Sequence, residues 1–559
     1  MRSIAAIALA ALVLLAAGPL SARTAVQVEV LAGSVTGPLN RINNGVMGDM
    51  SLILTMQGRE LMEQTAFALH DPQYRRTMGL LNTSHGFPTG TNVYHEDSEG
   101  NPYYDFTLFD QVYDVIIEEY MTPFVCLGFM PLPLSSAPPD SLRAPWQHPD
   151  RYPPEDYGKW HGLVSALVRH CLERYGREEI AGWKWEVWNE PDLRFFWQGS
   201  REEYFRLYDY TAAALKEVLP DAEIGGNAVA GAGSSFLDEF IRHCMDGKNY
   251  CTGGVGAPLD FISFHMKGGG SRFEGNLTSP ELISRANVKP RDPNLRGMLE
   301  RTEDALRRIS AIEGTVGIPV YITECDVDYG VSNSTYQDPN AVYRNNEYFA
   351  AFQCALFRGM LDLSSRYPNN RIESLIMDTF FFPGRRLFEG QRTLFTAGGI
   401  RKPIYCANKL LALLGSDELV VNCGPEKPKE LGVLATRNTR EAVKNTYRIL
   451  LFNFDQAQNH SDTIAVKLSI IDADPGDDLF LDHWRIDREH SNSYRAWLAM
   501  GSPLHPTPDQ MVWLEVRGHK ETLSSNEEFE VTDGVLRIEI ELPPHSVSLL
   551  QFNREILSP

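Results

Sequence analysis

Residues 183–193 read WKWEVWNEPDL, a run of tryptophans and β-forming residues that ends abruptly in Asn189-Glu190-Pro191. Aromatic and β-branched residues favour a strand, and Pro191 helps to end it because proline has no backbone N–H. Around this strand, strand-like and helix-like runs alternate from about residue 40 to residue 415. Such alternation predicts an α/β protein with a parallel sheet, and its length favours a (β/α)8 TIM barrel over 40–415.

The alternation can be followed run by run. The predicted strands are 124–131, 183–190, 222–227, 259–268, 319–326 and 371–382, and the predicted helices are 158–176, 201–219, 234–247, 295–314 and 345–363. No GxGxxG fingerprint opens any of these helices, which argues against a nucleotide-binding fold.

The pattern changes after about residue 415 to short β-rich runs separated by turn residues. The runs 447–454, 463–471 and 529–552 predict an accessory C-terminal antiparallel β-sandwich over 416–559, with a hairpin turn at Asp533-Gly534. The early run VQVEVLAG (26–33) has no place in the barrel. We therefore expect residues 23–39 to add a strand to the sandwich.

The first 22 residues have the features of a secretory signal peptide: Arg2, an apolar run over 4–17, and small residues at Ser21-Ala22. We expect a soluble protein that is secreted or periplasmic, or lysosomal in a eukaryote, with no membrane partner once the signal is cleaved. The net charge of -21 argues against nucleic acid and anionic membranes as partners, although one or two local cations would suffice to bind a single acidic group.

Eight cysteines are scattered along the chain without a metal-like cluster, and most of them are expected in the core. Cys244 and Cys251 are close enough in sequence to form a disulfide, which export would permit. The sequence gives no sign of a metal, and the chemistry expected below requires no cofactor.

Two glutamates mark strand ends that are far apart in sequence. Glu190 ends the 183–190 strand, and Glu324 lies at the end of YITECD (321–326). The C-terminal strand ends of a barrel form its active face. Two carboxylates there predict a glycoside hydrolase with a carbohydrate substrate, because one acid must protonate the leaving oxygen while the other attacks or activates water. Asn189 is placed to donate to a sugar 2-hydroxyl beside the anomeric carbon.

A specific resemblance supports this assignment. WKWEVWNEPDL, followed by FFW (195–197), resembles the acid/base segment of glycoside hydrolase family 39, and FVCLGFMP (124–131) resembles the strand upstream of it. The resemblance covers about residues 70–415, and the family contains β-xylosidases and α-L-iduronidases. It implies a retaining enzyme with Glu190 as acid/base and with Glu324, in ECDVDYG (324–330), as nucleophile.

Other stretches are similar to the iduronidase branch, notably FIRHCMDGKNYCTGG (240–254) and LDFISFHMKGGGS (259–271). The resemblance implies further substrate-binding residues: His265 lining the sugar subsite, Lys267 and Arg392 meeting a uronate carboxylate, Gly330 at a matching glycine, and Arg76 as an early subsite arginine. A lysine and an arginine in a partly desolvated pocket bind a carboxylate through charge-assisted hydrogen bonds.

The leading interpretation is therefore a retaining exo-glycosidase that releases terminal iduronic acid from polysaccharide or glycosaminoglycan fragments. TLFTAGGIRKPIY (393–405) instead resembles the xylosidase branch, and the loop before Arg392 lacks the Asp of the iduronidase pattern, with Asp378 lying earlier. A β-xylosidase or related neutral-sugar glycosidase is the alternative. A non-catalytic carbohydrate-binding protein is the third reading, but it would usually have lost one of the two glutamates.

Overall fold

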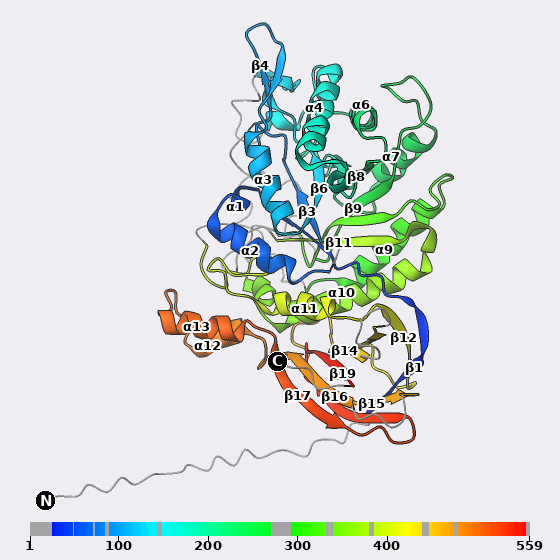
Figure 1. The fold of residues 1–559 in the computed structure, drawn as a ribbon, viewed down its shortest axis with the longest axis vertical. Coiled ribbons are helices and arrows are strands. Elements are labelled where there is room, and N and C mark those ends of the chain that lie inside the picture. Colours follow the sequence, from blue (N-terminus) through cyan, green and yellow to red (C-terminus); the bar gives the residue numbers. More distant parts are fainter. Residues whose placement is uncertain are drawn as a thin grey trace, which may run out of the picture.

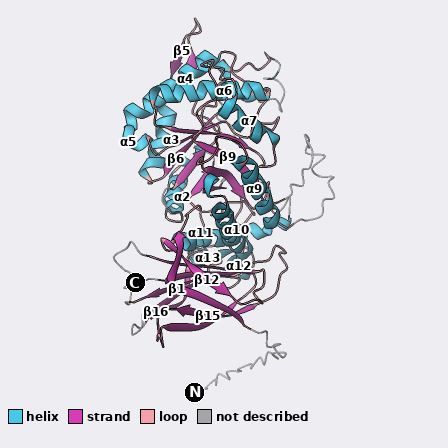
Figure 2. Ribbon diagram, turned by 90° about the vertical axis from the view of Figure 1, so that its right-hand side faces the viewer, coloured by secondary structure: helices cyan, strands magenta, loops and turns pink. Residues whose placement is uncertain are grey.

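The computed structural model describes residues 25–48, 50–70, 73–83, 89–139, 141, 148–269, 292–330, 335, 339–379, 385–438, 447–473 and 479–554. The expected signal peptide lies outside these residues. No helix in the described ranges has the length and apolar character needed to cross a bilayer. The barrel and the C-terminal sheet domain are stacked along the long axis of the molecule (Figures 1 and 2).

The barrel is closed by eight parallel strands in the order β10-β11-β2-β3-β6-β7-β8-β9. Their bounds are β2 Gly45–Gly48, β3 Tyr74–Thr77, β6 Thr122–Leu127, β7 Lys184–Val187, β8 Glu223–Val229, β9 Phe261–Lys267, β10 Val320–Asp326 and β11 Ile372–Asp378. The predicted TIM barrel is thus confirmed. Strands β2 and β3 could not be predicted from the sequence, because each has only four residues and carries no long apolar run.

Helices follow the strands and cover the outside of the barrel (Figure 1). They are α1 Met50–Ile53, α2 Met56–Ala66, α3 Thr107–Glu118, α4 Tyr157–Tyr175, α5 Arg177–Ile180, α6 Arg201–Val218, α7 Ser235–Asp246, α9 Leu295–Ser310, α10 Glu347–Arg366 and α11 Pro403–Ala412. Local sequence sets their starts. The Ser200 hydroxyl and the Glu203 carboxylate form a capping box at the start of α6, which satisfies two otherwise unpaired amides. A small hairpin, β4 Tyr94–Glu96 and β5 Pro102–Tyr104, lies between β3 and α3.

Aromatic rings fill the lower part of the barrel interior. Tyr74, Phe124, Phe261 and Tyr321, from four different strands, contact one another with ring centroids 5.2–5.9 Å apart. These residues lie towards the N-terminal ends of their strands. The barrel is therefore a packed core below, and polar side chains collect only at the C-terminal ends above it.

The C-terminal domain is a nine-stranded sheet in the order β17-β16-β19-β14-β13-β12-β1-β15-β18. The bounds are β1 Val26–Pro38, β12 Asp417–Cys423, β13 Leu431–Arg437, β14 Tyr447–Asn453, β15 Ile464–Ile471, β16 Leu479–Ile486, β17 Glu521–Phe529, β18 Val535–Leu542 and β19 Val547–Asn553. The expected accessory β domain is present. Its strands belong to one hydrogen-bonded sheet that encloses its own apolar core, and β1 pairs antiparallel with β12 and parallel with β15.

One local expectation differs from the structure. Asp533 and Gly534 do form a tight turn with positive φ, closed by Thr532 and Val535, but β17 and β18 on either side of it do not pair. They lie at opposite edges of the sheet, since β17 pairs with β16 and β18 with β15. The thiols of Cys244 and Cys251 are both free, with Cys244 buried on the inner side of α7.

Helix α10 joins the two domains because it packs on the barrel and on the C-terminal sheet. Tyr348 and Phe352 of α10 contact Phe454 at centroid distances of 5.3 and 5.8 Å, and Arg358 pairs with Glu418 at 2.5 Å. A helical insertion between β16 and β17, made of α12 Ser493–Ala499 and α13 Pro508–Arg517, projects to one side (Figure 1). The accessory domain is therefore firmly anchored to the wall of the barrel.

Candidate active site

Glu190 is fixed just beyond the end of β7 by hydrogen bonds to both neighbouring strands. The amide of Trp188 donates to Leu127 at 3.1 Å, and the amide of Glu190 donates to Ala228 at 2.9 Å. Trp188 and Glu190 have φ values of 71° and 47°, a left-handed conformation that non-glycine residues seldom adopt. Such strain is typical of functional positions, and here it turns the Glu190 side chain into the barrel mouth.

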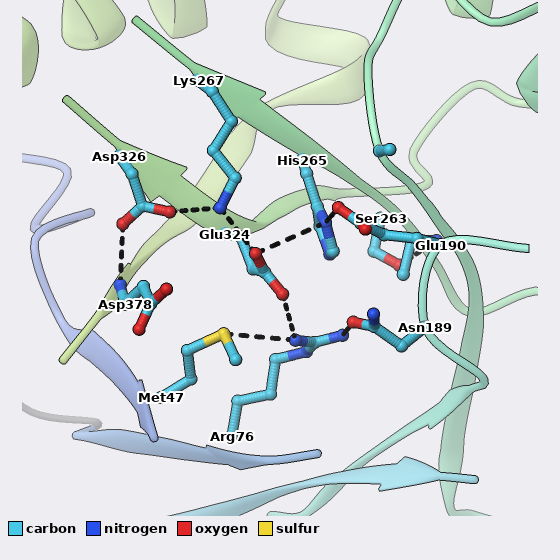
Figure 3. Close-up of polar contacts among 12 residues, drawn as sticks. Met47, Arg76, Asn189, Glu190, Ser263, His265, Lys267, Glu324, Asp326 and Asp378 are labelled. Carbon is cyan, nitrogen blue, oxygen red and sulfur yellow. Dashed lines mark hydrogen bonds and ion pairs between the residues drawn. The ribbon is translucent and has the colours of Figure 1, made fainter. Parts of the chain in front are cut away.

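Glu324 extends from β10 into the same mouth, where it is largely buried (Figure 3). Its carboxylate accepts from Arg76 NH1 at 3.2 Å and from Lys267 Nζ at 2.5 Å, and His265 Nδ1 lies 3.7 Å away. Burial alone would raise the pKa of Glu324, but the charges of His265, Lys267 and Arg76 together hold it well below its usual range. Glu324 is therefore kept ionised, as a nucleophilic carboxylate must be.

His265 links the two glutamates. Its Nδ1 lies 2.8 Å from Glu190 Oε1, and one oxygen of each glutamate and this nitrogen all lie within 4.8 Å of one another. Retaining glycosidases hold their carboxyl groups about 5 Å apart, whereas inverting enzymes need roughly 6.5–9.5 Å to admit a water. An oxygen of one glutamate thus lies within 4.8 Å of an oxygen of the other, which is the close approach that double displacement through a covalent intermediate requires.

Arg76 is fully buried beneath the two glutamates. Its guanidinium donates to Glu186 at 2.7 Å and to Asn189 Oδ1 at 2.9 Å, besides its contact with Glu324. With Oδ1 thus held by Arg76, the Nδ2 of Asn189 is buried without a hydrogen-bond partner in the described part of the chain. The orientation of Asn189 leaves this amide donor available to a ligand hydroxyl.

Lys267 is already paired with carboxylates of the chain. Its ammonium donates to Glu324 and to Asp326, two residues along the same strand (Figure 3). Burial would lower the pKa of Lys267, but Asp326 and Glu324 hold it above its ordinary value. Glu324, Asp326 and Asp378 have the spacing of a metal site, but the ammonium occupies the position between the first two of them.

Arg392 is paired in the same way. Its guanidinium donates to Asp378 at 2.6 Å and to the backbone oxygen of Asp328, and it lies 3.4 Å from Asp326. Burial raises the pKa of Asp378 to about 7, with Asp326 adding to the effect against the opposing charge of Arg392. The amide of Gly330 donates to Asp328 at 2.8 Å, which places Gly330 at the edge of this cluster.

Every cation in the described part of this cluster lies beside a carboxylate. The cations are Arg76, Lys267, Arg344 and Arg392, and the carboxylates are Glu186, Glu190, Glu324, Asp326, Asp328 and Asp378. Lys267 and Arg392 in particular each have carboxylate partners within the cluster, so an anionic ligand would have to compete with these carboxylates for them.

All the predicted site residues thus lie in one cluster at the barrel mouth. The carboxylates Asp326 and Asp378, which pair with the cations of this cluster, are not among the predicted residues. Asp326 could have been found, because residues two apart on a strand share a face and Glu324 faces the mouth. Asp378 had been noted only as lying before the Arg392 loop. The contact of Asp378 with Arg392 depends on how the loop before Arg392 folds, and no residue pattern in the sequence predicts the conformation of that loop.

Most aromatic residues of the 183–197 segment pack into the core. Trp185, Trp188 and Trp197 are almost completely buried, which excludes them as walls that stack on a sugar. Phe196 is partly buried against the core, whereas Phe195 is 56% exposed.

Comparison with known proteins identifies the family. A model described as glycosyl hydrolases family 39 matches residues 26–522. A β-xylosidase of Geobacillus stearothermophilus is 28% identical over 486 residues, 86% of each chain, and an α-L-iduronidase of Mus musculus is 26% identical over 438 residues, 73% of this chain and 62% of that protein. The crystal structure of a monomeric β-xylosidase from Caulobacter crescentus has a TM-score of 0.75 at 21% identity, covering 94% of this chain and 99% of the other. The chain belongs to glycoside hydrolase family 39 and is a glycoside hydrolase of a retaining family.

Proposed function

We propose that this enzyme is a β-xylosidase-type exo-glycosidase that removes a neutral sugar, most simply xylose, from the non-reducing end of an oligosaccharide. The observation that carries the proposal is that Lys267 and Arg392 are both already paired with carboxylates of the chain. A bound uronate would have to compete with these carboxylates for the same two cations, which reduces what it gains in return for the desolvation of its own carboxylate.

Two further observations support a neutral glycone. Burial beside Asp326 raises the pKa of Asp378 to about 7, and we expect the same burial to disfavour a further anion bound next to it. In addition, the similarity to the xylosidase of G. stearothermophilus extends over more of both chains than the similarity to the mouse iduronidase. The proposal therefore departs from the leading interpretation of the sequence and adopts its alternative.

In the proposed mechanism, Glu324 attacks the anomeric carbon while Glu190 donates its proton to the departing oxygen, which breaks the glycosidic bond and forms a glycosyl ester. Water, deprotonated by Glu190, then attacks this ester and regenerates both groups. Lys267, Arg76 and His265 keep Glu324 ionised for the first step. The unpartnered Nδ2 of Asn189 would donate to the sugar 2-hydroxyl, a contact that strengthens in the transition state.

A comparison of aryl glycosides tests the substrate class. The enzyme without its leader should hydrolyse 4-methylumbelliferyl β-D-xyloside far faster than the corresponding α-L-iduronide. A preference for the iduronide would refute the neutral-sugar proposal and leave the two-glutamate mechanism standing.

Variants of the two glutamates test the roles. Glu324→Ala should abolish turnover of every substrate. Glu190→Ala should slow substrates with poor leaving groups far more than activated aryl glycosides, which need no proton from the enzyme. Wild-type rates in both variants would refute the assignment.

A further inference from the structure

Phe195 is an exposed aromatic side chain immediately beyond the acid/base residue. It is 56% exposed, whereas Trp188 and Trp197 of the same segment are buried. A phenylalanine that packs into no core keeps a large apolar surface in water, and this surface is available to a ligand. Phe195 is therefore a candidate contact for a ligand that binds beside Glu190.

The chain places Phe195 on the Glu190 side of the mouth. The amide of Leu193 donates to Glu190 at 3.0 Å, and the amide of Phe196 donates to Leu193 at 2.9 Å. Five residues span at most about 17 Å when fully extended, and these two consecutive turns shorten that span considerably. Phe195 therefore lies well within about 17 Å of Glu190, on the loop that leaves the barrel mouth directly after it.

The turn that carries Phe195 is tied to the ends of two barrel strands. Trp188, which follows β7, donates through Nε1 to the backbone oxygen of Phe196 at 2.9 Å. Asp192 accepts the amide of Ala230, just beyond β8, at 2.9 Å. These bonds fix the direction in which the loop leaves the site.

The ring of Phe195 also rests on a rigid base. It packs edge-on against Phe196 at 4.8 Å, and Phe196 stacks on Phe129 at 5.8 Å. The guanidinium of Arg151 lies 3.2 Å above the centre of Phe129, and His148 contacts the edge of Phe195 at 5.3 Å. An aromatic ring held in this way loses little conformational entropy when a ligand stacks on it.

We propose that Phe195 is the stacking platform of a leaving-group subsite, which binds the pyranose ring of the sugar released in the first step. The inference rests on the proposed function, because it requires Glu190 to protonate the leaving oxygen. The departing sugar must then lie on the Glu190 side of the scissile bond. The apolar C–H face of a pyranose fits the exposed ring of Phe195, whereas a small aryl leaving group needs no such platform.

The two-step mechanism provides a selective test. The leaving group is present only while the glycosyl-enzyme forms, and it has departed before water attacks. The loss of a leaving-group contact must therefore lower kcat/KM for an oligosaccharide without changing the rate at which the glycosyl-enzyme is hydrolysed. With an activated dinitrophenyl glycoside the first step needs no proton from the enzyme, so we expect hydrolysis of this intermediate to limit kcat.

The experiment compares wild type with Phe195→Ala, Phe195→Tyr and Phe67→Ala. Phe67 is the control: it is 63% exposed at the end of α2, remote from the site. Substrates are the disaccharide and the dinitrophenyl glycoside of whichever sugar the wild type accepts. Phe195→Ala should lose about tenfold in kcat/KM on the disaccharide. It should keep kcat on the dinitrophenyl glycoside within about twofold, with Phe195→Tyr and Phe67→Ala close to wild type.

Each of the other possible results would overturn a specific part of the proposal. An unchanged kcat/KM of Phe195→Ala on the disaccharide overturns the subsite, as does an equal loss on both substrates, which would indicate damage to Glu190. A wild type that prefers the iduronide overturns the neutral-sugar proposal, but the same comparison on iduronides still tests the subsite. A wild type that hydrolyses no glycoside overturns both.

Discussion

Replacing Lys267 by methionine removes the cation closest to Glu324 while preserving most of the volume of the side chain. The ammonium lies 2.5 Å from Glu324 and also binds Asp326. Two unit charges 4 Å apart interact by about 4 kcal/mol at an effective dielectric constant of 20. Since one pKa unit corresponds to about 1.4 kcal/mol, the loss should raise the pKa of Glu324 from well below the usual glutamate range towards that range.

The pH dependence of kcat/KM measures this effect on the free enzyme. The rate falls at low pH as Glu324 takes up a proton, so the acid limb for Lys267→Met should lie about 2 to 3 pH units above that of wild type. The variant should also unfold more easily, by about 3–5 kcal/mol, because Glu324 and Asp326 lose their shared partner. Its preference for xyloside over iduronide should stay as in wild type, since Lys267 is not expected to touch the sugar.

Lys402→Met is the matched control. Lys402 is equally buried, but its ammonium donates to the backbone oxygens of Arg344 and Gln391 rather than to a carboxylate. Its loss should leave the acid limb in place. An unshifted acid limb in Lys267→Met would refute the electrostatic argument, and a selective loss of iduronide hydrolysis would show that Lys267 binds a uronate after all.

Two further predictions concern Asn189 and Asp378. Asn189→Ala should lower kcat/KM on an aryl xyloside by about 100-fold but affect the 2-deoxy analogue far less, and an equal loss on both would exclude a contact with the 2-hydroxyl. Burial beside Asp326 gives Asp378 a folded-state pKa of about 7 against about 3.9 when unfolded, so only the folded state holds this proton between those pH values. Its contribution to stability is thus fully present below about pH 4 and is lost as pH rises to 7. Asp378→Asn, which can still accept from Arg392, should therefore show a smaller fall in melting temperature over that window; an identical fall would refute the assignment.

The fold could be predicted wherever the hydrophobic pattern is long and regular. The strands around Glu190 and Glu324 alternate with helices of ten or more residues, so the barrel follows from periodicity alone. The four-residue strands β2 and β3 lack such a pattern, and the closed barrel defines them through their neighbours. The hairpin predicted at Asp533-Gly534 was wrong for another reason. The local residues determine the turn, but they do not determine which strands pair with each other.

The meeting of the two glutamates at one mouth could be predicted from the sequence, because each lies near the C-terminal end of a strand and a barrel brings such ends together. The substrate could not be predicted from the sequence, because it depends on how the charged side chains pair once the chain has folded. Lys267 and Arg392 look like a carboxylate-binding pair when only their residue types are considered. Asp326 and Asp378 pair with them in the folded barrel, and under the proposed function these cations support Glu324 rather than contact a uronate. The glycone must therefore be inferred from the charge balance of the whole cluster, which only the structure provides.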